Sequence, residues 1–274
     1  MIARLLLGPA LLVNFAVFLA PMLNLATLSF REARPGGSMG DGFTLSTWQS
    51  LIEDPYYVDL VIGSIGLAIP VTIATLFAAY PLALFIHRAA PRWRSLLVVA
   101  CISPLLVSAV VRTYGWMVIL GDNGIVAAAM RAVGIKPPRM VFNTSGVAIA
   151  LVEILMPTMI LCLLAGFGRL NAALEEAAAS LGAPPWRVFI RVVLPLSLPG
   201  VLLGCLLAFV LTVSSFITPK LLGGGRVILL ATEIYDQAIV TLNWPVAAAL
   251  SVLSLAVFGA ALMLYGRILR QVEA

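Results

Sequence analysis

Long apolar segments, separated by shorter polar connections, make up most of this chain. A helix needs about 20 mostly apolar residues to cross the ~30 Å hydrocarbon core of a bilayer. The pattern therefore predicts an all-α membrane protein with six transmembrane helices. The six segments run approximately over residues 5–29, 60–86, 95–120, 141–167, 196–219 and 245–265.

The first apolar segment follows Arg4 and is too long for the 7–15-residue core of a signal peptide, so we expect a retained span. The polar stretch after it contains Pro35-Gly36-Gly37, which favours a turn. The short connection at residues 87–94 holds Arg88, Arg92 and Arg94 and no acidic residue. Because cytoplasmic loops are enriched in Arg and Lys, this connection should be cytoplasmic, and both termini with it.

Composition supports a membrane protein and narrows its chemistry. Only 11% of the residues are charged, against about a quarter in soluble domains. The net charge of +5 is explained by the enrichment of Arg and Lys in the cytoplasmic loops of membrane proteins, so we expect no nucleic-acid partner. A single histidine, His87, and three cysteines within apolar segments argue against metal ligands and catalytic residues. No phosphate-binding Gly-rich loop occurs, so we expect no cofactor in this chain.

A polar island lies between the fourth and fifth apolar segments. Residues 174–181 are Ala-rich and favour a helix, and Gly182 permits a sharp turn. Pro185 suits the first turn of a second helix, in which Trp186, Phe189, Ile190 and Val193 share one face. The island therefore predicts a helix–turn–helix. It could lie on the lipid surface or dock on a partner protein. The adjacent Glu175 and Glu176 favour a partner that carries Arg.

Glu176-Ala177-Ala178, Gly182 and Leu194-Pro195 stand in the register of a known motif, with Val192 in place of Ile. They resemble the cytoplasmic coupling loop of ATP-binding cassette importer permeases. The resemblance implies that residues 169–195 contact an ATPase. The residues implied to make this contact are Glu175, Glu176, Ala177, Ala178, Gly182, Ala183 and Trp186.

Other segments resemble the spermidine/putrescine-type branch of these permeases. They are Ser103-Pro104-Leu105-Leu106, Arg112-Thr113-Tyr114-Gly115-Trp116, Phe216-x-x-Pro219, Leu221-Leu222-Gly223-Gly224 and Asn243-Trp244-Pro245. The resemblance implies a permease subunit of the bacterial inner membrane that works with three kinds of partner. These are a second permease, expected to be a different homologous chain, two cassette ATPases that bind ATP and Mg, and an external binding protein.

The resemblance also divides the chain into a first span with its external loop (1–57), a permease core (58–266) and a cytoplasmic tail (267–274). The chain departs from the family pattern in one place. Many polyamine-type members carry an acidic residue before the Phe of Phe-x-x-Pro, and here that residue is Ser215. Polyamines, opines, aminophosphonates and ferric ions stay open as substrates, and a small amine-containing solute is the expectation.

Glu153 and Arg112 are the charged residues that lie deep in predicted spans. A charge there costs at least ~2.5–3.5 kcal/mol and points to a function. Glu153 would lie ~18 Å deep, near the bilayer midplane. It could meet a substrate ammonium or pair structurally with the second permease. Pro157 would kink its helix and favour a cavity there. The expected substrate path comprises Glu153, Arg112, Tyr114, Trp116, Ser215 and Phe216, although the aromatic residues also fit an interfacial belt.

Glu233 and Asp236 lie in a gate-like helix predicted over residues 228–242 and are expected to face solvent. Two other functions compete with an importer permease. A secondary transporter driven by an ion gradient would carry more acidic residues in its spans, and a membrane enzyme would need clustered ligands or nucleophiles. We therefore expect a permease subunit of an ATP-driven importer that performs no chemistry itself.

Overall fold

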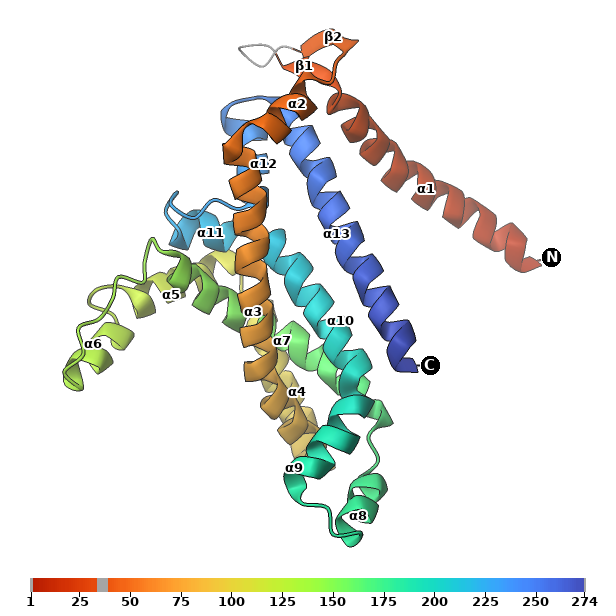
Figure 1. Cartoon of the computed structure of the whole chain (residues 1–274), viewed down its shortest axis with the longest axis vertical. Helices are drawn as coiled ribbons and strands as arrows, with labels where there is room; N and C mark the ends of the chain where they lie inside the picture. The colour runs from red at the N-terminus through yellow and green to blue at the C-terminus, as the bar shows by residue number, and fades with distance from the viewer. Residues whose placement is uncertain (1, 34–38, 274) are drawn as a thin grey trace. The chain divides into compact units, whose positions relative to one another are not determined.

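The computed structural model describes residues 2–33 and 39–273, and these are mostly helical (Figure 1). The helices are α1 (Ile2–Leu28), α2 (Ser46–Glu53), α3 (Pro55–Arg88), α4 (Pro91–Ile102), α5 (Ala109–Leu120), α6 (Ile125–Ala132), α7 (Thr144–Gly166), α8 (Ala172–Ser180), α9 (Pro185–Val188), α10 (Leu194–Val213), α11 (Ile217–Leu222), α12 (Leu230–Tyr235) and α13 (Trp244–Glu273). Shorter elements are strands β1 (Arg31–Ala33) and β2 (Met39–Phe43), 3-10 helices η2 (Ser103–Leu106) and η3 (Phe167–Arg169), and π-helices η4 (Phe189–Val193) and η5 (Asp236–Val240). The turn predicted at residues 35–37 lies outside the described residues.

Within the described residues, four helical stretches are long and apolar enough to cross a membrane. They are Pro55–Arg88, Thr144–Gly166, Pro185–Val213 and Trp244–Gln271, and they confirm four of the six predicted spans. A bent pair, Pro91–Leu106 with Ala109–Ala132, gives a fifth if it counts as one span. In α1 the apolar helix found among the described side chains covers Phe15–Leu28, so the first span stays a prediction. The described residues therefore contain four helices that could span a membrane, or five with the bent pair.

The third predicted span is not one continuous helix, because the chain bends by 94° between α4 and α5. Pro104 has no N–H with which to bond the carbonyl of Ala100, four residues earlier. The hydroxyl of Ser103 donates to that carbonyl instead, at 2.9 Å. The chain then passes through η2 and leaves helical geometry at Val107 and Ser108. The local chemistry of Ser103-Pro104 therefore breaks the apolar segment in two.

The fifth predicted span is displaced along the sequence. It begins at Pro185, because α9, η4 and α10 form one continuous helix, and it ends at Val213 rather than near residue 219. The chain restarts as α11 at Ile217. Pro219 then lies in the first turn of α11, where its missing N–H costs little. The segment that carries Ser215 and Phe216 is therefore a break between two helices.

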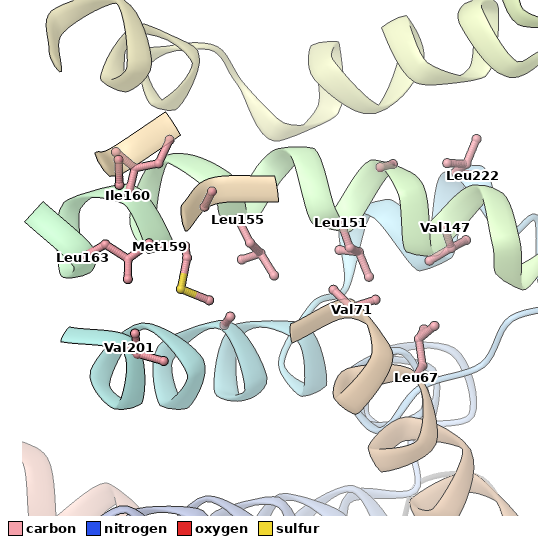
Figure 2. Close-up of a cluster of buried hydrophobic side chains, with 14 of the residues drawn as sticks. Leu67, Val71, Val147, Leu151, Leu155, Met159, Ile160, Leu163, Val201 and Leu222 are labelled. Atoms are coloured by element: carbon pink, nitrogen blue, oxygen red, sulfur yellow. The ribbon is translucent and has the colours of Figure 1, made fainter. Parts of the chain in front are cut away.

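The described chain forms two compact units, residues 63–229 with 258–274 and residues 1–62 with 230–257. Helix α7 lies at the centre of the core of the first unit (Figure 2). Leu151, Leu155 and Met159 of α7 share this core with Val71 of α3 and Val201 of α10. In the second unit, β1 and β2 pair antiparallel.

The crossing of α7 and α10 depends on glycine. A Cβ atom on Gly166 would lie 2.6 Å from the Cα of Gly200, closer than side chains tolerate. A Cβ on Gly204 would overlap the sulfur of Met159, which points towards α10 in Figure 2. Gly200-x-x-x-Gly204 thus places two glycines on one face, as membrane helices do where their backbones approach closely. This crossing fixes where α10, and the segment that precedes it, leaves the core.

Candidate functional site

The segment between α7 and α10, residues 172–193, has the predicted helix–turn–helix geometry; we call it the interhelical segment (Figure 1). The side-chain oxygen of Asn171 caps α8 by accepting from the N–H of Ala173 at 3.0 Å. Helix α8 ends in a Schellman motif, in which Gly182 has φ +80° and Ala183 donates to the carbonyl of Ala178. The predicted turn at Gly182 is confirmed. Pro184 and Pro185 then begin α9.

The outer surface of the interhelical segment is apolar and uncovered. Leu181 is 89% exposed, Trp186 61% and Ile190 52%. The predicted apolar face is divided, because Val193 is buried together with Val188, whereas Trp186 and Ile190 are exposed. The cause is η4, whose wider π-turn rotates the side chains away from the spacing of an α-helix.

Polar and aromatic contacts join the interhelical segment and its flanks to the last turns of α3. The guanidinium of Arg88 donates to the carboxylate of Glu175 at 2.6 Å. The ring of Tyr80 lies edge-on to those of Phe167 and Phe189, each with centroids 5.6 Å away. The Tyr80 hydroxyl is hydrogen-bonded to the Ser197 hydroxyl at 2.9 Å. Glu175 therefore faces α3, whereas Glu176 and Ala177 remain exposed.

The predicted substrate-path residues are only partly brought together. Trp116 of α5 donates its indole N–H to the carboxylate of Glu153 on α7, at 3.0 Å, and both side chains are half-buried. Arg112 lies one turn before Trp116 on the same helix. Tyr114 turns away and is 54% exposed. The residue beside the Glu153 carboxylate is thus an aromatic donor.

Ser215 and Phe216 lie just before α11, which packs on α5. The hydroxyls of Thr113 and Thr218 are 3.1 Å apart and buried, and they join these two helices. After α11, the carbonyl of Leu222 accepts from the N–H of Phe142, and the Phe142 ring lies over Gly224, where a Cβ atom would not fit. This close contact explains Gly224, and at Gly223 a Cβ atom would overlap the carbonyl oxygen of Pro219.

Sequence reasoning missed the environment of Glu233. Its expected exposure is wrong, because the residue is only 6% exposed. The hydroxyl of Tyr56 donates to one carboxylate oxygen at 2.6 Å, and the amide of Gln237 donates to the other at 2.7 Å. Asp236 is partly buried and also has a partner. Gln237 follows Glu233 by four residues, a helical spacing that could have indicated this pair.

Comparison with known proteins decides the family. The family described as binding-protein-dependent transport system inner membrane component matches residues 94–271. The chain belongs to this family. It is a transport permease rather than a catalytic enzyme, and its apolar helices are those of a multi-pass inner membrane protein.

Curated relatives agree with this assignment. The permease is 34% identical, over 82% of both chains, to the spermidine/putrescine transport system permease protein PotB of Escherichia coli (strain K12). It is 33% identical to PotB of Haemophilus influenzae (strain ATCC 51907 / DSM 11121 / KW20 / Rd), over 89% of this chain and 86% of the relative. These findings do not support the alternative of an ion-gradient-driven secondary transporter.

Solved structures agree on the fold. A chain of a bacterial alginate ABC transporter, solved in complex with an alginate pentasaccharide-bound periplasmic protein, matches the permease with a TM-score of 0.76. The identity is 16%, over 98% of this chain and 96% of that chain. A chain of the MetNI methionine ABC transporter matches with a TM-score of 0.57 and 16% identity, over 80% of this chain and 99% of that chain.

Proposed function

We propose that the permease carries a polyamine or a related small amine-containing solute into the cell, driven by ATP. An external binding protein delivers the solute. Two cassette ATPases bind ATP and Mg on the cytoplasmic side, and a second, homologous permease completes the path. The relatives named for spermidine and putrescine support this substrate class. In this arrangement α1 is the first of six spans, the bent α4–α5 pair is the third, and both termini are cytoplasmic.

The interhelical segment is the part that meets the ATPase. Its apolar tip at Leu181 and Trp186 is the observation that carries this proposal, because exposed apolar surface rimmed by polar residues is typical of a protein-binding site. Gly182 lies between them with open space around it. The docking residues are Glu176, Ala177, Ala178, Gly182, Ala183 and Trp186. Glu175 supports them from the side of α8 that faces α3.

Substitution of Gly182 tests the docking. Gly182→Trp places a large side chain on the tip and should abolish both co-purification of the ATPase and ATP-driven uptake. A non-glycine residue at φ +80° is strained by itself, at about 1–2 kcal/mol, so Gly182→Ala is the matched control. The alanine variant should keep most uptake. Normal uptake by the tryptophan variant, inserted at normal level, would contradict docking at this turn.

Glu153 is the carboxylate that meets the substrate ammonium. A carboxylate accepts about four hydrogen bonds, and Trp116 supplies one of them. The remaining acceptor sites suit an ammonium donor, and the indole face can add cation–π attraction. Arg112, one turn away, would contact an anionic group in a solute such as an opine. Ser215 and Phe216 lie at the helix break that would line the same path.

The orientation can be tested by labelling cysteines with an impermeant thiol reagent in intact cells. Phe43 is 78% exposed in β2, and Pro91 begins α4. Phe43→Cys should react from outside and Pro91→Cys should not. The reverse result would place the interhelical segment on the external side, away from ATP, and would contradict the proposed coupling.

A further inference from the structure

Helix α8 needs an attachment other than burial if its movement is to reach α3. None of the described side chains of α8 is buried. Helix α8 lies against α9 and η4, the start of the Pro185–Val213 helix, and the Arg88–Glu175 ion pair joins it to α3. We propose that Arg88, Glu175 and Tyr80 are positioning residues that clamp the interhelical segment to the end of α3, so that ATPase movement is delivered to α3 as well as to α10. This inference rests on the proposed function.

The exposure of the ion pair argues for positioning rather than for stability. The side chains of Arg88 and Glu175 are 52% and 24% exposed. Exposed ion pairs add little to the free energy of unfolding, because water screens them. They do fix geometry, since the short N–O contact sets the distance between the last turn of α3 and the first turn of α8.

Tyr80 supplies a second fixed point about two turns earlier on α3. It contacts the rings of Phe167 in η3 and Phe189 in η4, and its hydroxyl reaches Ser197 in α10. Phe167 is fully buried, so this point is anchored in the core. Two fixed points on one helix define a direction as well as a distance. Rotation of the interhelical segment would therefore turn the end of α3.

The space between the two fixed points is not filled. A hollow of about 380 Å³ lies there, lined among others by Leu84, Arg88, Glu175, Val188 and Phe189. Close packing therefore does not join α3 to the interhelical segment along this stretch. Without the ion pair, α8 could shift into the hollow while α3 stays in place, and the ATPase stroke would be lost.

A charge exchange tests the clamp in the complete transporter, reconstituted in proteoliposomes with its ATPases and loaded binding protein. Arg88→Glu should still bind the ATPases and hydrolyse ATP, yet carry at least fivefold less solute per ATP. Glu175→Arg should lose uptake similarly. The double exchange Arg88→Glu with Glu175→Arg should return transport per ATP to within twofold of the unchanged protein. Arg92→Glu, an exposed arginine outside the pair, is the matched control and should transport normally.

The outcomes separate the clamp from the docking on which it rests. Normal transport per ATP in Arg88→Glu would overturn the clamp. So would a double exchange that fails to restore uptake, because Glu175 would then act by touching the ATPase directly. Loss of the ATPase from Arg88→Glu would also overturn it, since Arg88 would then serve docking. Failure of the proposed function would give a different result, because the ATPase would then not co-purify even with the unchanged permease.

Discussion

At the α7–α10 crossing the backbones meet at Gly166 and Gly200 with no room for a side chain, whereas Leu181 and Trp186 leave most of their surface uncovered. Both regions are apolar, so composition alone does not distinguish them. At the crossing, both of the packed surfaces belong to this chain, one on α7 and one on α10. In the interhelical segment, the Asn171 cap and the Gly182 turn set the backbone conformation. The apolar side chains at its tip, however, have no covering surface within this chain. The contrast shows that close packing within this permease ends at the interhelical segment, where a partner protein is expected to bind.

The crossing can be broken with one side chain. Gly200→Leu would drive a Cβ atom to within 2.8 Å of the Gly166 Cα and separate α7 from α10. Overpacking typically costs about 1–3 kcal/mol, and more where backbone is the obstacle. We expect at least a tenfold loss of folded protein in detergent, measured by size-exclusion chromatography. Gly259→Leu, which meets nothing within 4 Å, is the control and should fold normally.

The opposite result is expected at the interhelical segment. Trp186→Ala should leave folding unchanged, because the ring is mostly exposed. Aromatic residues at the centre of interfaces contribute about 2 kcal/mol or more, so affinity for the ATPase should fall about thirtyfold. Titration of the ATPase onto nanodisc-embedded permease measures this. Trp93 is an exposed tryptophan outside the segment, so the control variant Trp93→Ala should bind the ATPase normally. Equal losses of affinity in both variants would contradict a specific role of the interhelical segment in ATPase binding.

Substitution of Glu153 tests whether this carboxylate on α7 binds the transported solute. Glu153→Gln keeps the shape and the acceptor for Trp116 but removes the charge. Loss of about 1.4 kcal/mol of attraction would change apparent substrate affinity tenfold. A structural ion pair with the second permease predicts lost assembly instead, because its partner charge would stay uncompensated at ~3–5 kcal/mol. Complex yield and substrate-stimulated ATPase activity, measured together, distinguish the two.

The smallest effect is expected at Glu233. Tyr56→Phe removes one of two donors to this buried carboxylate, at a cost of about 1 kcal/mol. The thermal midpoint should fall by a few degrees, while ATPase binding stays unchanged. Tyr57→Phe removes a neighbouring hydroxyl that lies in the field of Glu233 but is not one of its two hydrogen-bond donors, and it should lower the midpoint less. The same midpoint in Tyr56→Phe and the unchanged chain would contradict the hydrogen bond.

Local chemistry made much of the fold predictable. Uninterrupted apolar length gave the spans at Pro55–Arg88 and Thr144–Gly166. The Gly182 turn followed from a glycine before two prolines. The break at Pro104 was not predictable from apolar length, because membrane helices often tolerate proline without ending. The feature that could have indicated the break is Ser103 before Pro104, because its hydroxyl donates to the Ala100 carbonyl that Pro104 cannot reach with an N–H.

Long-range pairing was not predictable. Tyr56 lies 177 residues before Glu233, and Arg88 lies 87 residues before Glu175. No local pattern relates such positions. The π-turn at Phe189–Val193 also has no composition of its own, so the face of α9 was assigned from an α-helical spacing that the chain does not follow. The roles of Glu153, Arg112 and Ser215 stay predictions.

The central claim, that the interhelical segment is where this permease meets its ATPase, can be tested at Leu181. A photo-reactive amino acid at this position, which is 89% exposed, should form a covalent adduct with the ATPase in native membranes. The same amino acid at Phe77, 75% exposed in the middle of α3, should not. An adduct from position 181 alone is the predicted result. An ATPase adduct from position 77 with none from position 181 would contradict the account.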